Sequence, residues 1–125
     1  MYLEHVNMSV ANLDRTIDFY GKLLGLRVRW RGTTSDGLPA AHIGDERHYL
    51  ALFEVGDADP KPADYGRPGL NHFGFVVDDL DACRAKLDEL GAPVEAPPPY
   101  NPGRRLYFDD PNGVEVELVE YAKAG

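Results

Sequence analysis

Two histidines and one glutamate supply the residue types of a divalent-metal site, which are neutral imidazole and carboxylate. His5 and His72 each begin a stretch of alternating residues. Glu117 lies between Val116 and Leu118 in a segment that is otherwise mostly apolar. Because an unpaired carboxylate in apolar surroundings is costly, Glu117 needs a cation or several hydrogen-bond donors. Either histidine alone would more often form a hydrogen bond than bind a metal.

An internal repeat makes the two histidines equivalent. The segment LEHVNMSVANLD aligns with LNHFGFVVDDLD, so that His5 meets His72. After a deletion of one residue the alignment continues and pairs Gly25 with Gly91. The equivalence of the histidines, together with the position of Glu117, favours a metal site over two unrelated structural histidines.

Each half of the repeat is predicted to fold as a β-α-β-β-β module. Asn12 and Asp79 are suitable N-caps, and each is followed by apolar residues at helical spacing. Gly25 and Gly91 are placed to end the helices, because glycine adopts the left-handed conformation without a Cβ penalty. The strands are expected at 5–10, 27–31, 40–43, 49–55, 72–77, 94–96, 105–108 and 114–121.

The chain is predicted to form one α+β domain, 1–125, from these two tandem modules. Modules 1–55 and 70–125 are joined by a linker, 56–69, that is rich in Pro, Gly and Asp. A module of about sixty residues has too little core to stand alone. The two modules are therefore expected to pair, with the helices outside and a curved mixed β-sheet lining a cleft.

The composition narrows the classes of partner. A formal net charge of −8 argues against nucleic acid and against an anionic membrane, since both require clustered Lys and Arg. No basic leader pattern and no stretch of ~18 apolar residues is found, so a cytoplasmic location is expected. The single cysteine, Cys83, lies in an apolar helical pattern, which favours a buried small side chain over a nucleophile. A small molecule is the expected partner.

The repeated modules, their opening histidines and the segment DPNGVEVEL at 110–118 resemble the vicinal oxygen chelate superfamily. This group includes type I glyoxalases, bleomycin-resistance proteins, extradiol dioxygenases and fosfomycin thiol transferases. The resemblance implies that His5, His72 and Glu117 hold one divalent metal, for which Fe, Mn, Ni, Co and Zn are all suitable. Three protein ligands would leave positions for two oxygens of a substrate. Glu115 lies on the same face and is the alternative ligand if the register is shifted.

The residue at position 51, an alanine, affects which reaction can be expected. Ala51 is the repeat partner of Glu117, and the resemblance to type I glyoxalases implies a second carboxylate there. Alanine cannot ligate, so glyoxalase I activity is not expected unless Glu54 or His48 supplies the base. The expected function is a metal-dependent enzyme that acts on a small substrate chelated through vicinal oxygens, by dioxygenase-, lyase- or isomerase-type chemistry.

Substrate contacts are expected from side chains on the same face as the ligands. Asn7 and Ser9 share the face of His5 by the period of a strand. Tyr107 lies ten residues before Glu117, a spacing that the resemblance to fosfomycin transferases and extradiol dioxygenases implies for a tyrosine. Its phenol is the candidate catalytic donor to a bound oxyanion. The alternative for Tyr107 is an amphipathic core residue.

A loop rich in proline, 96–105, provides further candidates. Tyr100, Arg104 and Arg105 are expected to bind substrate, the arginines by contacting a carboxylate or phosphate. The alternative for the two arginines is a solvated surface that balances nearby acidic residues.

The resemblance also implies a homodimer with shared sites, in which His5 of one chain joins His72 and Glu117 of the other. A monomer with an internally closed cleft is the alternative. The second interpretation of the function is a metal-free drug-binding protein similar to bleomycin-resistance proteins. In that protein, aromatic side chains would stack on a cationic aromatic ligand; the candidates are Trp30, Tyr49, Tyr65 and Tyr100.

Overall fold

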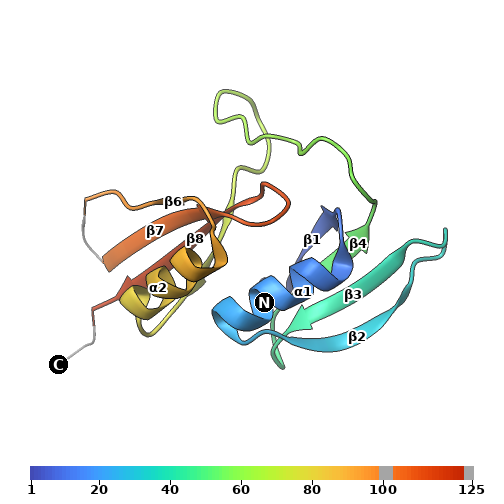
Figure 1. Cartoon of the computed structure of the whole chain (residues 1–125), viewed down its shortest axis with the longest axis horizontal. Coiled ribbons are helices and arrows are strands. Elements are labelled where there is room, and N and C mark those ends of the chain that lie inside the picture. The colour runs from blue at the N-terminus through green and yellow to red at the C-terminus, as the bar shows by residue number, and fades with distance from the viewer. Residues whose placement is uncertain (99–102, 123–125) are drawn as a thin grey trace. The chain divides into compact units, whose positions relative to one another are not determined.

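The computed structural model describes residues 1–98 and 103–122. The chain divides into two compact units, Met1–Asp59 and Pro60–Gly125 (Figure 1). Each unit contains one helix and one four-stranded sheet, and the two units follow the same plan.

Unit 1 is a complete β-α-β-β-β module. Its elements are β1 (His5–Val10), α1 (Leu13–Leu24), β2 (Arg27–Thr33), β3 (Pro39–Gly44) and β4 (Tyr49–Glu54). The strand order in the sheet is β1-β4-β3-β2. β1 runs parallel to β4, and the other neighbours are antiparallel. This mixed pairing places His5 at one edge strand of the sheet.

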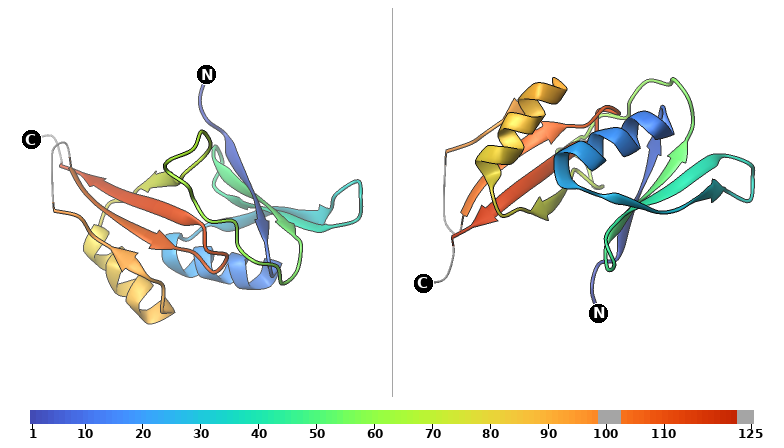
Figure 2. Two further views of the ribbon diagram at one scale, coloured as in Figure 1. Left: turned by 90° about the horizontal axis from the view of Figure 1, so that it is seen from above. Right: turned by 60° about the horizontal axis from the view of Figure 1, so that its bottom comes forward.

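Unit 2 repeats this arrangement. Its elements are β5 (Phe73–Val76), α2 (Leu80–Leu90), β6 (Val94–Glu95), β7 (Gly103–Asp109) and β8 (Glu115–Tyr121). The strand order is β5-β8-β7-β6, again with one parallel pair, β5 and β8. The linker 56–69 contains neither helix nor strand (Figure 2).

The predicted helix signals are confirmed at both ends of each helix. The side chain of Asn12 accepts a hydrogen bond from the Arg15 amide, and Asp79 accepts one from the Ala82 amide. The helices end at Gly25 and Gly91, whose φ angles of 70° and 72° lie in the left-handed region that glycine tolerates. Each helix therefore begins and ends at equivalent residues of the repeat.

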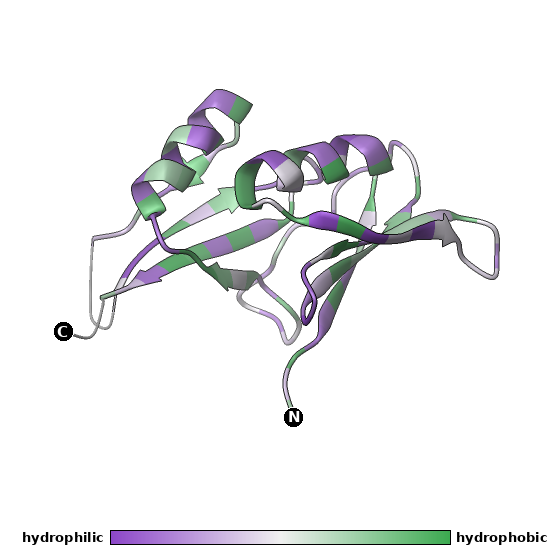
Figure 3. Cartoon of the chain, turned by 90° about the horizontal axis from the view of Figure 1, so that it is seen from below, coloured by the Kyte–Doolittle hydropathy of each residue, from purple (hydrophilic) through white to green (hydrophobic). Residues whose placement is uncertain are grey.

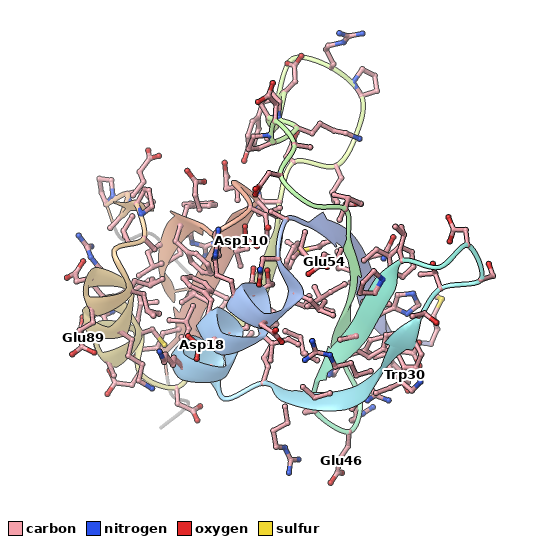
Figure 4. The ribbon with its side chains drawn as sticks, turned by 45° about the vertical axis from the view of Figure 1, so that its right-hand side comes forward. Asp18, Trp30, Glu46, Glu54, Glu89 and Asp110 are labelled. Carbon is pink, nitrogen blue, oxygen red and sulfur yellow. The ribbon has the colours of Figure 1, made fainter. Side chains whose placement is uncertain are left out.

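A glutamate on the last strand of each unit bonds to the start of that unit's helix, and this contact identifies the helix side of each sheet. Glu54 at the end of β4 accepts a hydrogen bond from the Leu13 amide at 2.8 Å (Figure 4). Glu120 on β8 accepts one from the Leu80 amide at 3.0 Å. Because strand side chains alternate, even-numbered residues of β4 and β8 face the helix and odd-numbered residues face away.

The core of each unit lies between its helix and this face of its sheet. The helices bury their apolar sides, and Cys83 is buried as predicted, which raises the pKa of its thiol. Figure 3 shows hydrophilic (purple) and hydrophobic (green) residues alternating along the strands, as expected of sheets with one face against a core. The strand residues buried against the helices include Leu50, Leu52, Leu106, Phe108, Val116 and Leu118.

The structure confirms the predicted α+β class and both β-α-β-β-β modules. The predicted boundaries match the structure at β1, and each of the other strands begins or ends one or two residues away from its predicted position. The strand after the linker, β5, begins one residue after His72, β6 has only two residues, and β7 begins at Gly103. None of the helices in the described part of the chain is long and apolar enough to cross a membrane.

Candidate functional site

The helix-free face of sheet B, the sheet of unit 2, collects several predicted residues. Arg104 donates to Asp81 of α2 at 3.3 Å, so it lies on the helix side of β7. Arg105 and Tyr107 point to the opposite face by alternation. Tyr107 pairs with Glu117 across β7 and β8. Arg105, Tyr107 and Glu117 therefore share one face, while Arg104 lies on the other.

Glu117 is half-buried between an arginine and a glycine. Arg105 Nη1 lies 3.4 Å from Glu117 Oε1, and the two side chains are only 13% and 16% exposed. Arg105 thus supplies the cation that a buried carboxylate requires. The separation is long for a charge-assisted hydrogen bond, which is usually about 2.7–2.9 Å. A Cβ at Gly74 would lie 3.3 Å from Glu117 Oε2, so this glycine leaves the space that the carboxylate occupies.

His72 lies beside this face in contact with three side chains. The ring of Tyr107 meets His72 edge-on, with centroids 5.3 Å apart. The hydroxyl oxygen of Tyr65 lies 3.0 Å from His72 Nδ1, and Glu115 Oε1 lies 3.6 Å from the same nitrogen. Tyr65 donates its hydroxyl hydrogen to Glu115, and this bond raises the pKa of Tyr65 to about 12.

On the helix-free face of sheet A, the sheet of unit 1, His5 is held by a carboxylate and an aromatic ring. His5 Nδ1 lies 2.9 Å from Glu4 Oε1, and this contact is the main reason that the pKa of Glu4 is lowered. The ring of Tyr49 stacks on His5 with centroids 4.8 Å apart. The Tyr49 hydroxyl also donates to Glu4 Oε1 at 3.2 Å.

The row of rings continues across sheet A through His42, which the sequence did not assign to a site, to Trp30, a predicted stacking residue of the drug-binding alternative. His42 on β3 stacks on Tyr49 at 4.5 Å, and Trp30 on β2 lies 5.0 Å from His42. The guanidinium of Arg29 lies 4.4 Å from the centre of the Tyr49 ring. His42 pairs with Ala51 across β3 and β4. Because Ala51 is the repeat partner of Glu117, the residue paired with Ala51 on the neighbouring strand could have been singled out from the sequence, and that residue is His42.

A pocket of about 530 Å³ adjoins this row at the β2–β3 hairpin. Trp30, His42 and Phe53 form aromatic walls, with Ala40 between them and Asp36 in the hairpin. Figure 4 shows Trp30 on this hairpin. Unit 1 therefore carries an open pocket with several aromatic lining residues.

The remaining predicted contacts of unit 1 lie on the same face as His5. Asn7 donates its side-chain amide to the Ala51 carbonyl at 2.9 Å, so this group is already engaged. Ser9 is exposed on β1 opposite Phe53. Ala51 is 6% exposed and has no ligating atom. Tyr100, predicted to bind substrate, lies outside the described residues.

The three predicted ligands are divided between the units. His5 belongs to unit 1, and His72 and Glu117 belong to unit 2. Among residues 1–98 and 103–122, no group of three or more His, Cys, Asp or Glu side chains is close enough to hold a metal. The ligand set as a whole therefore stays a prediction.

The residues nevertheless fit a metal. Both histidines use Nδ1 to contact an oxygen, His5 through Glu4 and His72 through Tyr65. Histidines that bind metals usually engage their second nitrogen in this way, because the contact fixes the ring and its tautomer. In both, Nε2 is the nitrogen left for a metal. Glu117 adds a half-buried carboxylate, which lies 3.4 Å from Arg105 Nη1, a long distance for an ion pair.

The comparison with known families decides the membership of the chain. The model of the Glyoxalase/Bleomycin resistance protein/Dioxygenase superfamily matches residues 2–118. The chain belongs to this superfamily. Within the superfamily, it is 28% identical to lactoylglutathione lyase of Neisseria meningitidis, over 96% of this chain and 91% of that one. It is also 28% identical to glutathione transferase FosA of Serratia marcescens, over 93% and 78%.

Solved structures of the superfamily agree with the fold. A glyoxylase/bleomycin resistance protein/dioxygenase domain from Frankia sp. EAN1pec superposes with a TM-score of 0.80 and 24% identity, covering 98% of each chain. Similarity at this level of identity establishes the fold alone.

The surroundings of His42 predict how stability depends on pH. Burial, followed by the charge of Arg29, lowers the pKa of His42 below the ordinary value of 6.5. As the pH falls, His42 is therefore protonated in the unfolded chain before it is protonated in the folded one. The stability that neutral His42 contributes to the fold is present above about pH 6.5 and is lost as the pH falls through the lowered pKa. Urea unfolding measures the free energy of unfolding at pH 7 and at pH 5. The decrease from pH 7 to pH 5 should be smaller in His42→Gln than in the unchanged protein. Equal losses would contradict this role.

Proposed function

We propose that this superfamily member is an enzyme that depends on one divalent metal held by His5, His72 and Glu117. The observation that carries the proposal is the helix-free face of sheet B, where Glu117 lies beside Tyr107 and Arg105 and where His72 contacts Tyr107. The engaged Nδ1 atoms of both histidines support it. Two relatives named as enzymes, a lyase and a transferase, are consistent with catalysis.

The protein's own groups have distinct roles in this proposal. The metal, when bound, supplies a Lewis acid that polarises two neighbouring oxygens of a small substrate. Tyr107, which shares its strand face with Glu117 and contacts His72, stabilises negative charge on a substrate oxygen by hydrogen bonding. Arg105 attracts an anionic group to the half-buried face. Ser9 contacts the substrate from β1.

The proposed chemistry is of the dioxygenase, lyase or isomerase type, without glyoxalase I activity. Glyoxalase-type proton transfer needs a base near position 51, where this chain has Ala51. Glu54 is held on the helix side of β4 by the Leu13 amide. His48 is exposed and lies 3.7 Å from Asp45 Oδ1. The contacts of these two alternative bases with Leu13 and Asp45 therefore do not bring either of them to Ala51.

The proposed assembly is a cytoplasmic homodimer in which each site takes His5 from one chain and His72 and Glu117 from the other. The single 125-residue chain would then fold as one domain, and two equivalent sites would follow from the two-fold symmetry.

Metal content tests the proposal directly. Protein purified without chelator is expected to hold one divalent ion per chain by elemental analysis, and His5→Ala and His72→Ala should each lose it. If His5→Ala keeps its metal, the ligand set is wrong. Turnover is then sought with each candidate metal against catechols, hemithioacetals and epoxides.

The same variants test the shared site. When His5→Ala and His72→Ala chains are unfolded together and refolded, a heterodimer with shared sites contains one intact site and one that lacks both histidines. Metal should therefore return to half of the sites in the heterodimer. A site formed within one chain would give no return.

The pocket at the β2–β3 hairpin favours one other function, a metal-free small-molecule binding protein. Trp30, His42 and Phe53 offer flat apolar surfaces, and Asp36 adds a negative charge that would attract a cationic ring. Trp30 is the only tryptophan of the chain, so its fluorescence reports on this pocket alone. Quenching by aromatic cations, in protein that neither retains metal nor shows turnover, would favour this function over the enzyme.

A further inference from the structure

A tyrosine of the linker contacts one of the proposed metal ligands. The Tyr65 hydroxyl oxygen lies 3.0 Å from His72 Nδ1, and the hydroxyl donates a hydrogen bond to Glu115 Oε1. His72 Nδ1 and Glu115 Oε1 are themselves 3.6 Å apart. Tyr65 therefore links a histidine next to β5 with a carboxylate on β8.

A short turn presents Tyr65 to these partners. The carboxylate of Asp64 accepts a hydrogen bond from the Gly66 amide at 3.0 Å, and its carbonyl accepts one from the Arg67 amide at 3.2 Å. Asp is well suited to this role, since its side chain can bond the backbone two residues later. Tyr65 is 60% exposed, so burial of its ring is not what holds it in place. The side chain is held instead by the two polar contacts of its hydroxyl, with His72 and Glu115.

The direction of the hydrogen bonds follows from counting protons. A tyrosine hydroxyl carries one hydrogen, and a carboxylate can only accept. Because Tyr65 gives its hydrogen to Glu115, its oxygen must accept from His72. His72 Nδ1 therefore carries a hydrogen. In neutral histidine the other nitrogen, Nε2, then has the free lone pair that a metal requires.

We propose that Tyr65 is a positioning residue that holds His72 in the Nδ1–H tautomer and so keeps Nε2 available to a divalent metal. This inference rests on the proposed function for the identity of the ligand, but the effect on the tautomer does not depend on a metal. Outer partners of this kind typically change metal affinity by about ten- to a hundredfold when they are removed.

Unit 1 provides a matched control, because the hydroxyl of its tyrosine, Tyr49, contacts the carboxylate partner of the histidine, whereas the Tyr65 hydroxyl contacts the histidine itself. His5 Nδ1 contacts the carboxylate of Glu4 directly, at 2.9 Å. The Tyr49 hydroxyl donates to the same carboxylate oxygen at 3.2 Å, while the Tyr49 ring stacks on His5, a contact that phenylalanine would keep. Loss of the Tyr49 hydroxyl leaves the acceptor of His5 in place, whereas loss of the Tyr65 hydroxyl removes the nearest acceptor of His72.

Nitrogen-15 NMR of the histidine rings in metal-free protein, at a pH where they are neutral, tests the tautomer. We expect the Nδ1–H form at His72 in the unchanged protein and a shift toward the Nε2–H form in Tyr65→Phe. Tyr49→Phe should leave both His72 and His5 unchanged. By calorimetry, the Zn(II) affinity should fall about tenfold in Tyr65→Phe and less than about twofold in Tyr49→Phe.

An Nε2–H tautomer at His72 in the unchanged protein would overturn the inference, as would a Tyr65→Phe variant with the same tautomer and the same Zn(II) affinity. The second result would mean that Glu115 takes over as acceptor. If the tautomer shifts as expected but the unchanged protein binds no Zn(II), the positioning role is supported and the proposed metal function fails. The two failures are therefore distinguishable.

Discussion

Glu117→Gln is expected to lower the affinity for the divalent metal by more than about a hundredfold, beyond the range for groups that act only through a ligand. The substitution keeps the shape of the side chain and an oxygen that can accept from Arg105, so the fold should be preserved. It removes the negative charge that a hard or borderline cation prefers in its ligand. Isothermal calorimetry with Zn(II) and Mn(II), together with the content of metal after purification, measures the effect.

Glu115→Gln is the matched control, since Glu115 lies on the same strand face two residues earlier. Glu115 contacts Tyr65 and lies near His72. We expect a loss of affinity of about tenfold, through His72. A larger loss for Glu115→Gln than for Glu117→Gln would mean that Glu115 is the ligand and that the strand register was assigned wrongly from the sequence.

The fold could be predicted from the sequence because its signals are local and occur twice. Asn12 and Asp79 cap helices whatever the rest of the chain does, and Gly25 and Gly91 end them in a conformation that suits glycine. The strand boundaries were less certain. β6 is an edge strand of two residues, and such a short pairing leaves little alternation to detect.

The sequence could predict the face on which a site residue lies when alternation within a single strand decides it. It could not predict contacts between side chains of different strands or of the linker. The period of two places Arg105 and Tyr107 on the opposite face from Arg104, although the sequence assigned both arginines to the substrate. The sequence predicts Tyr65 only as a stacking residue, because its contact with His72 joins the linker to the sheet and no local pattern signals such a contact. His42 was missed because its partners belong to other strands of the sheet.

Leu52→Ala and Leu118→Ala are expected to have the largest effects on stability. The two leucines are repeat partners on the central strands β4 and β8, and both are fully buried. Truncation of a buried leucine costs about 2–5 kcal/mol of unfolding free energy, because apolar contacts are lost and a cavity remains. Urea unfolding followed by circular dichroism measures the change in each variant.

The two variants also test the proposal that the chain is a single domain. A unit of about sixty residues buries a smaller share of its surface than a chain of this length and is marginal by itself. If the units stabilise each other, both substitutions must lower one shared transition, although the altered residues lie in different units. Fluorescence of Trp30 reports on unit 1 alone, so it should follow the same curve as circular dichroism in Leu118→Ala. A Trp30 transition that does not move in Leu118→Ala would mean that unit 1 unfolds independently.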